Sequence, residues 1–489
     1  MVDMINESAR QTPVIAQTDV LVIGGGPAGL SAAIAAGRLG ARTMIVERYG
    51  SLGGVLTQVG VESFAWYRHP GTEDCEGICR EYEGRARALG FTRPEPQSIS
   101  EVIDTEGFKV VADQMITESG VEPLYHSWVV DVIKDGDTLC GVIVENKSGR
   151  GAILAKRIVD CTGDADIAAR AGAPWTKRSK DQLMGVTVMF SCAGVDVARF
   201  NRFVAEELKP TYADWGKNWT IQTTGKEDPM FSPYMEDIFT RAQQDGVIPG
   251  DAQAIAGTWS TFSESGEAFQ MNMVYAFGFD CTDVFDLTKA EIAGRQQALW
   301  AIDALRHYVP GFENVRLRNF GATLGTRESR LIEGEIRIAD DYVLNQGRCS
   351  DSVGIFPEFI DGSGYLILPT TGRFFQIPYG CLVPQKVENL LVAGRCISAG
   401  VVAHTSMRNM MCCAVTGEAA GTAAVVSLQQ NCTVRQVAIP DLQNTLQQHQ
   451  RGLALYCIAA LSLICAFFSL RLSRQLQHMK KERRNIRPH

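Results

Sequence analysis

The residues with the clearest chemistry in this sequence form a glycine-rich turn at 24–29, GGGPAG, which fits the pattern G-x-G-x-x-G. Gly24 allows a tight turn after a strand, Gly26 lets the backbone approach a pyrophosphate, and Gly29 lets a helix pack closely on a sheet. The first N–H groups of that helix and its positive dipole end favour phosphate oxygens. Glu47 follows Gly29 by 18 residues, near the spacing of about 20 expected for a carboxylate that binds a ribose hydroxyl.

The segment around the turn has the elements needed to position it. Residues 19–47, DVLVIGGGPAGLSAAIAAGRLGARTMIVE, are typical of a buried strand, the turn, an alanine-rich helix and a second strand that ends at Glu47. We therefore predict a dinucleotide site, and a glycine turn that binds nothing is the alternative. The residues predicted to contact the cofactor here are Gly24, Gly26, Pro27, Ala28, Gly29, Glu47 and Arg48.

Composition narrows the classes of function. The chain has 489 residues and a net charge of −8, and an acidic chain is a poor partner for nucleic acid, so we expect none. Its fourteen cysteines are scattered without the spacing of a zinc site, so no metal is expected. Free thiols favour a reducing compartment. The N-terminus lacks the apolar stretch of a secretory signal, which indicates a cytoplasmic body.

The C-terminal end differs from the rest of the chain. Residues 453–470, LALYCIAALSLICAFFSL, contain no charge, and most charges in the tail that follows are lysines and arginines. As a helix this run would be about 27 Å long, close to a hydrocarbon core of roughly 30 Å. We expect an apolar helix at 452–470 that associates the body with a membrane and a basic tail at 471–489 on anionic lipid. A spanning helix, a helix in the interface and a buried C-terminal helix are the open alternatives.

Local patterns predict the elements between these ends. Apolar spacing indicates a helix over 104–119, and short apolar runs separated by glycines indicate strands over 124–133, 139–145 and 152–160. Aromatic residues become dense after about residue 176, where strands mix with helices.

The late part of the chain again has the pattern of buried strands and helices that surrounds the glycine turn. A helix is predicted at 288–307, a buried strand at 387–397 and a small-residue helix at about 406–427. The fold class is therefore α/β, with a Rossmann-like dinucleotide-binding domain built from two chain segments, an inserted α+β substrate or cap domain and a C-terminal apolar helix. The predicted units are 14–175 and 380–428 for the binding domain, 176–379 for the inserted domain, 429–451 for a polar connector, 452–470 for the apolar helix and 471–489 for the tail.

Three separated segments carry a resemblance to a known family. They are VIGGGPAGLSAAIAAGRLGARTMIVER at 22–48, RIVDCTGDADIAARAGA at 157–173, and IPYGCLVPQKVENLLVAGRCIS at 377–398 with the helix that follows. In this order they resemble the FAD-dependent oxidoreductases of the glutathione-reductase-like (GR2-type) fold, related to fumarate reductase flavoproteins. GATLGTRESRLIEGE at 321–335 is similar to an arginine- and glutamate-containing signature of that family. The resemblance covers about 18–450.

The resemblance implies FAD that is bound without a covalent link. FAD is too long for one strand–helix–strand unit, so a late strand that ends in a glycine must supply a second contact. No histidine lies between Gly54 and Tyr67, where relatives attach flavin covalently. No second glycine turn lies between 165 and 300, so a separate nicotinamide domain is not expected. The further cofactor contacts that the resemblance implies are Gly53, Gly54, Val129, Gly163, Asp164, Gly394 and Arg395.

Three residues are candidates for catalysis. His404 could act as an acid or base beside the flavin ring, and a structural hydrogen-bonding histidine is the alternative. Arg327 suits a carboxylate substrate through bidentate contacts, with a salt-bridged helix start as the alternative. Arg373 follows a glycine-rich loop near the return to the first domain and could reach the site. A helix that starts near Ser406 is expected to direct its N-terminus at the flavin, where negative charge develops on reduction.

Together these features predict an FAD-dependent oxidoreductase that transfers a hydride between flavin N5 and a small organic substrate. A flavin monooxygenase would use the same cofactor site and is one alternative. A membrane-tethered flavoprotein subunit that passes electrons to a partner is the other. The electron acceptor is left open.

Overall fold

The computed structural model describes residues 4–5, 7–64, 67–68, 71–94, 100–209, 219–222, 235–252, 255–258 and 261–448. The predicted apolar helix at 452–470 and basic tail at 471–489 lie outside the described residues. Among the described residues, one helix, Met410–Gln429, is long and apolar enough to cross a membrane. The protein buries 94% of its most apolar window, as expected for the core helix of a folded body.

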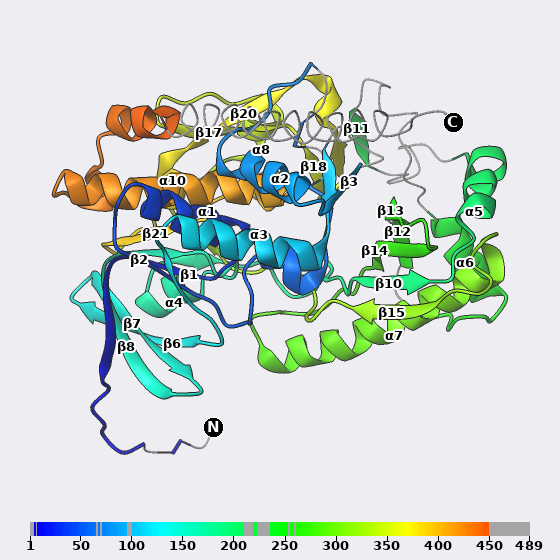
Figure 1. Cartoon of the computed structure of the whole chain (residues 1–489), viewed down its shortest axis with the longest axis horizontal. Helices are drawn as coiled ribbons and strands as arrows, with labels where there is room; N and C mark the ends of the chain where they lie inside the picture. The colour runs from blue at the N-terminus through cyan, green and yellow to red at the C-terminus, as the bar shows by residue number, and fades with distance from the viewer. Residues whose placement is uncertain are drawn as a thin grey trace, which may run out of the picture.

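A seven-stranded sheet forms the centre of the molecule (Figure 1). β1 (Val14–Ile23) pairs in parallel with β2 (Thr43–Val46) on one side and with β8 (Gly149–Asp160) on the other. β5 (Glu122–Leu124) extends the sheet beyond β2, and β21 (Leu390–Val392) lies parallel to the carboxyl end of β8. The carboxyl ends of these parallel strands meet at one edge, where ligands bind in open α/β sheets.

An antiparallel meander continues this sheet. β6 (Trp128–Asp135) pairs with β7 (Thr138–Asn146), and β7 pairs with the first half of β8. The predicted strands at 139–145 and 152–160 are confirmed by β7 and β8. The prediction of one strand at 124–133 is wrong in detail, because these residues are divided between β5 and β6.

Helices cover both faces of the central sheet. Along β1, Val20 and Val22 pack in a core with α1 (Pro27–Arg38), α3 (Thr105–Glu118) and α10 (Met410–Gln429). The alternate β1 residues face the opposite core, which includes α4 (Asp166–Ala171). This two-residue alternation places one apolar face of the strand on each side of the sheet.

Two glycines bring α10 against α1. A Cβ atom on Gly417 would lie 2.0 Å from the carbonyl oxygen of Ala28, and one on Gly421 would lie 2.1 Å from that of Ala32. The two helices therefore approach backbone to backbone at two points, which lie one helical turn apart along each helix. This contact fixes the N-terminus of α1 relative to α10.

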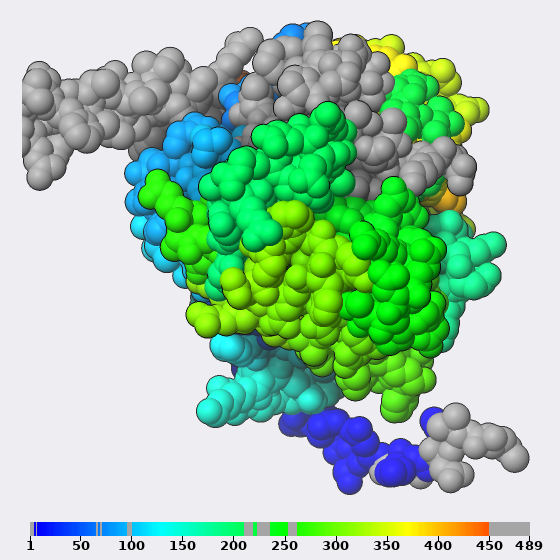
Figure 2. Space-filling view, turned by 90° about the vertical axis from the view of Figure 1, so that its right-hand side faces the viewer, coloured from blue at the N-terminus to red at the C-terminus, as the bar shows by residue number. Residues whose placement is uncertain are grey.

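A second layer stands beside the first and has its own core (Figure 1). Its five-stranded sheet has the order β12-β14-β10-β15, with β13 beside β14. Seen from this side, the chain coloured green, which includes α7, forms most of the surface (Figure 2). The bounds are β10 (Phe190–Ala193), β12 (Ile255–Thr258), β13 (Thr261–Phe262), β14 (Glu267–Val274), β15 (Arg316–Phe320), α5 (Val197–Phe203), α6 (Glu236–Gln244) and α7 (Val284–Tyr308).

The segment before β21 packs with the first layer. Phe356 on β17 (Ser352–Pro357) and Phe375 on β20 (Phe374–Pro378) belong to the same core as α1 and α10. The boundary at residue 379 stays a prediction, although this packing joins residues before it to the first layer. The smaller elements are α2 (Ile78–Ala88), β3 (Thr92–Pro94), β4 (Glu101–Ile103), β9 (Trp175–Thr176), β11 (Thr220–Gln222), β16 (Leu331–Ile332), α8 (Asp340–Leu344), β18 (Ile360–Gly362) and β19 (Tyr365–Ile367).

The predicted helices are confirmed in two places and corrected in a third. α3 confirms the helix at 104–119, and α7 contains the one at 288–307. The helix predicted at about 406–427 is two helices, α9 (Val401–Met407) and α10, with Asn409 as the N-cap of α10. Ser406 consequently lies in the last turn of α9 rather than at a helix N-terminus.

Candidate cofactor and active site

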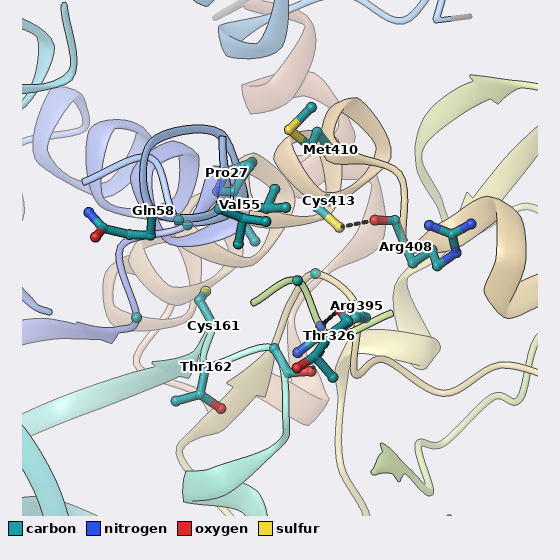
Figure 3. A pocket seen from close by; sticks show the side chains of 18 of the residues that line it. Pro27, Val55, Gln58, Cys161, Thr162, Thr326, Arg395, Arg408, Met410 and Cys413 are labelled. Carbon is teal, nitrogen blue, oxygen red and sulfur yellow. Dashed lines mark hydrogen bonds between the residues drawn. The ribbon is translucent and has the colours of Figure 1, made fainter. Parts of the chain in front are cut away.

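A cavity of about 390 Å³ lies at the carboxyl edge of the central sheet. Figure 3 shows Pro27, Val55 and Gln58 on one side, Met410 and Cys413 on another, and Thr326 and Arg395 below them. The second layer contributes residues of β14 and the loop after it. The wall is built mainly from residues 23–28, 46–49, 54–64, 127–129, 161–167, 270–275, 323–327, 393–395 and 408–413.

The glycine turn has the geometry that its spacing predicts. Gly24 has a φ of +95°, and a Cβ there would lie 2.5 Å from the carbonyl oxygen of Cys161. A Cβ on Gly29 would lie 1.7 Å from the carbonyl oxygen of Gly24. At Gly26 the nearest atom to a Cβ would be Gly54 Cα, 3.9 Å away. The first two glycines therefore permit close backbone packing, whereas Gly26 borders open space in the cavity.

The N-terminus of α1 faces this space without a side-chain cap. Gly26 is the N-cap residue, and Pro27 occupies the first turn. Pro27 and Ala28 both line the cavity. Uncapped N–H groups at a helix start, with room left by a glycine, suit the two phosphates of a dinucleotide.

Glu47 fixes the turn to the end of β2. Its Oε2 accepts a hydrogen bond from the Gly25 N–H at 2.6 Å, and its Oε1 accepts one from the Tyr49 N–H at 2.9 Å. The side chain also lines the cavity, so its predicted contact with a ribose stays a prediction. The structure adds a role in holding the backbone of the turn.

Aromatic rings surround the guanidinium of Arg48 at the same end. Its Cζ lies 4.9 Å from the centroid of the Tyr49 ring and 5.2 Å from that of Trp128. Val129 follows Trp128 on β6, and all four residues line the cavity. Flat apolar and cationic groups of this kind suit the adenosine end of a dinucleotide.

Arg395 joins three separated parts of the chain, namely the resemblance segments 157–173 and 377–398 and the signature stretch at 321–335. Its Nε donates to the carbonyl of Gly163 at 2.9 Å, and one terminal nitrogen donates to the Asp164 carboxylate at 2.7 Å. The other donates to the carbonyl of Thr326 (Figure 3). The predicted contacts at 163–164 and 394–395 therefore lie together, and Arg395 has a structural role that its sequence does not indicate.

The structure places the predicted cofactor residues in two groups. Gly29 and Gly53 lie behind the wall, where the Gly53 N–H donates to the Gly25 carbonyl at 2.8 Å. Those that line the cavity are Gly24, Gly26, Pro27, Ala28, Glu47, Arg48, Gly54, Val129, Gly163, Asp164, Gly394 and Arg395.

Arg327 is the catalytic candidate that reaches the cavity. Its guanidinium donates to the carbonyl of Gly185 at 2.7 Å and to the side-chain oxygen of Asn272 at 3.1 Å. Its Cζ also lies 4.4 Å from the centroid of the Tyr275 ring. The salt bridge considered as the alternative is made by its neighbour Glu328, which pairs with Arg178.

His404 does not line the cavity, and its role as acid or base stays a prediction. The side chain is 1% exposed within α9. Its Nε2 lies 3.1 Å from the carbonyl oxygen of Arg327 and must be the donor, because a carbonyl only accepts. Burial lowers the pKa of His404 to about 4, so the ring is neutral at pH 7. His404 thus holds the backbone of Arg327 from behind.

Arg373 also lies away from the cavity wall. It forms an ion pair with the fully buried carboxylate of Glu358 and donates to the side chain of Gln222 at 2.6 Å. Burial raises the pKa of Glu358, and Arg373 opposes that shift. The role of Arg373 in the site stays a prediction, and the contact that the structure shows is its compensation of the buried Glu358 charge.

The structure brings residues into the cavity that sequence reasoning missed. Arg408 follows α9, and Asn409 and Met410 form the start of α10. The helix N-terminus expected near Ser406 thus reaches the cavity three residues later. Tyr275 and Asn272 come from the second layer. None of these residues stands in a recognisable motif, because the break between α9 and α10 and the docking of β14 place them.

Comparison with known proteins supports FAD as the cofactor. Residues 19–446 match the family described as FAD dependent oxidoreductase. The chain is 29% identical over 198 residues to thiamine thiazole synthase from Aeropyrum pernix, a match that covers 35% of this chain and 68% of that protein. It is 29% identical over 157 residues to digeranylgeranylglycerophospholipid reductase from Picrophilus torridus, covering 30% of this chain and 39% of that protein.

One solved structure that aligns with this chain is a geranylgeranyl bacteriochlorophyll reductase-like protein from Thermoplasma acidophilum. It aligns with 90% of this chain and 83% of its own, with a TM-score of 0.42 and 13% identity. The match to the family over most of the chain, rather than this distant likeness, identifies the cofactor as FAD.

Proposed function

Because the chain belongs to the FAD dependent oxidoreductase family, we propose that it transfers a hydride between flavin N5 and a small organic substrate in this cavity. One observation carries the proposal. The glycine turn, the segments joined by Arg395 and a separate group of polar side chains from the second layer all line the same space. Cofactor and substrate can therefore meet there without a large movement of the chain.

The residues that line the cavity support binding of FAD along its wall. The uncapped start of α1 would hold the pyrophosphate, and Glu47, Arg48 and Val129 would hold the adenosine end. Gly163 and Gly394, linked through Arg395, would support the middle of the cofactor. The GR2-type relation to fumarate reductase flavoproteins, the two-segment domain and the non-covalent attachment are parts of this proposal.

FAD supplies the redox chemistry when bound, and the chain supplies orientation and electrostatics. Phe356 and Phe359 give the cavity an apolar side that excludes water. The N-terminus of α10 at Asn409 favours negative charge nearby, since the 20-residue helix directs its positive dipole end there. Arg327, fixed by Asn272 and Gly185, orients a substrate from the second-layer side.

Membrane association belongs to the same proposal but depends on other residues. The apolar run and basic tail at 452–489 support a body attached to a membrane, and a small-molecule substrate would then reach the cavity from the cytoplasmic side.

Anaerobic reduction tests the reaction. The FAD-loaded protein is mixed without oxygen with carboxylates, amines and polyols, and the flavin absorbance is followed. We expect one class to bleach the flavin with no added NAD(P)H. Bleaching only with NAD(P)H, followed by oxygen incorporation into the substrate, would replace the proposal by a monooxygenase. Electron exchange only with artificial acceptors would favour the electron-transfer subunit. Purification of the protein without FAD would refute the proposed cofactor site.

A further inference from the structure

The cavity wall contains a further arginine, Arg408, at the end that Figure 3 shows away from Pro27 and Gln58. Arg408 lies between α9 and α10, and its side chain is 15% exposed. One terminal nitrogen donates to the backbone carbonyl of Asp361 at 3.0 Å and stands 3.5 Å from the carboxylate of the same residue. Among the described residues, the buried Nε of Arg408 has no hydrogen-bond partner. A buried guanidinium thus keeps an unused donor.

Arg327 faces the same part of the cavity but is held firmly. Asn272 and Gly185 accept two of its hydrogen bonds, and the ring of Tyr275 lies against its guanidinium. His404 fixes its backbone carbonyl. These contacts lock the orientation of the side chain before any ligand arrives, which lowers the entropy cost of binding.

The charges at this end do not balance. Burial lowers the pKa of Arg408, the Asp361 carboxylate opposes that shift, and the positive charge of Arg327 adds to it, so the three groups act on one another. The guanidiniums of Arg327 and Arg408 carry two positive charges and the Asp361 carboxylate carries one negative charge, so one positive charge is in excess. Asp361 is 36% exposed in its side chain and stands beyond hydrogen-bond distance, so it compensates Arg408 incompletely. An excess positive charge beside an unused donor is costly when water is excluded.

We propose that Arg408 and Arg327 form a subsite for the carboxylate of an organic monoanion. This inference rests on the proposed function and names the substrate class of that site. A carboxylate is planar and accepts parallel N–H bonds from a guanidinium, which suits the free donor of Arg408. One negative charge cancels the excess of this cluster, whereas a dianionic phosphate would leave an excess of the opposite sign.

Titration of FAD-loaded protein with matched pairs of ligands tests the subsite. Acetate, butyrate and benzoate are each compared with the corresponding primary amide, and inorganic phosphate is added separately. Dissociation constants come from calorimetry and from the difference spectrum of the flavin. We expect at least one carboxylate to bind more than tenfold tighter than its amide. Arg408→Gln should weaken the binding of that carboxylate by about tenfold to a hundredfold without lowering the FAD content. Arg408→Lys should lose less of the carboxylate affinity.

An exposed arginine provides the matched control. Arg199 on α5 pairs with Glu313 at the surface of the second layer, and Arg199→Gln should leave every dissociation constant unchanged. Equal binding of all carboxylates and amides, tighter binding of phosphate, or an unaltered carboxylate affinity in Arg408→Gln would overturn the subsite. Each of these results leaves FAD bound and the proposed function intact. Loss of FAD from the unmodified protein would instead reject the proposed function, and calorimetry on the apoprotein would still test the arginines.

Discussion

The contact between α1 and α10 makes a quantitative prediction about two chemically identical substitutions. Gly421→Ala adds a methyl group where α10 meets the backbone of α1, 2.1 Å from the carbonyl oxygen of Ala32. Gly84→Ala adds the same group to the exposed face of α2, where no atom lies within 4 Å. Both glycines lie inside helices, so both variants gain the same backbone propensity.

The sizes of the two effects follow from the structure. Alanine is favoured over glycine in a helix by about 1 kcal/mol, and Gly84→Ala should keep that whole gain. At Gly421 the methyl group must move about 0.9 Å to reach even a tight contact of 3.0 Å. The atom in the way is backbone in a packed pair of helices, so overpacking should cost about 3 kcal/mol. Gly421→Ala should therefore be about 2 kcal/mol less stable than the unmodified protein.

Thermal unfolding followed by circular dichroism measures both variants, with and without added FAD. Gly84→Ala should raise the melting temperature and Gly421→Ala should lower it, also in the absence of the cofactor. A rise in both variants would refute the close approach of α1 and α10. The flavin content of Gly421→Ala should fall as well, because the same contact positions the N-terminus of α1.

Three further predictions address the site, buried charges and the chain end. Gly26→Ala should keep the fold but lose most of the bound FAD, since its methyl group would enter the cavity; full flavin absorbance after purification would refute this placement. Burial raises the pKa of Glu418 from 4.5 to about 7 and lowers that of His404 from 6.5 to about 4. Glu418 should thus cost stability as pH rises from 4.5 to 7, and His404 should cost stability as pH falls from 6.5 to 4. When melting temperatures are measured across this pH range, Glu418→Gln should lack the decrease between pH 4.5 and 7, and His404→Gln should lack the decrease between pH 6.5 and 4. Parallel curves for the two variants and the unmodified protein would contradict both expectations. Ending the chain after Gln450 should release a soluble yellow protein, and its retention in the membrane fraction would place the anchor elsewhere.

Short-range patterns predict the part of the site that depends on local backbone geometry. The glycine turn and Glu47 are specified by spacing within one strand–helix–strand unit, and their positions follow from that spacing. The resemblance implies cofactor contacts at 163–164 and 394–395, but no local pattern predicts the hydrogen bond between Arg395 and Gly163, because 232 residues separate them.

Side-chain direction within the later helices could not be predicted in the same way. His404 and Arg408 lie one helical turn apart, yet the first is buried behind Arg327 and the second faces the cavity. The choice depends on how α9 packs against β18 and on the break before α10, which are tertiary features. The ion pair of Arg373 is likewise not specified by a local pattern, since the buried Glu358 that pairs with it is 15 residues away in the sequence.

The late arrival of β21 affects how the protein is made. Its partner β8 ends at Asp160, so roughly 230 residues must be translated before Leu390 emerges from the ribosome. At about 5–20 residues per second this takes roughly 10–50 s. During that interval the backbone edge of β8 at Ile158–Asp160 lacks its final neighbour, and such edges promote association between nascent chains. Chaperone protection during synthesis should therefore improve the yield of soluble protein more than added flavin does.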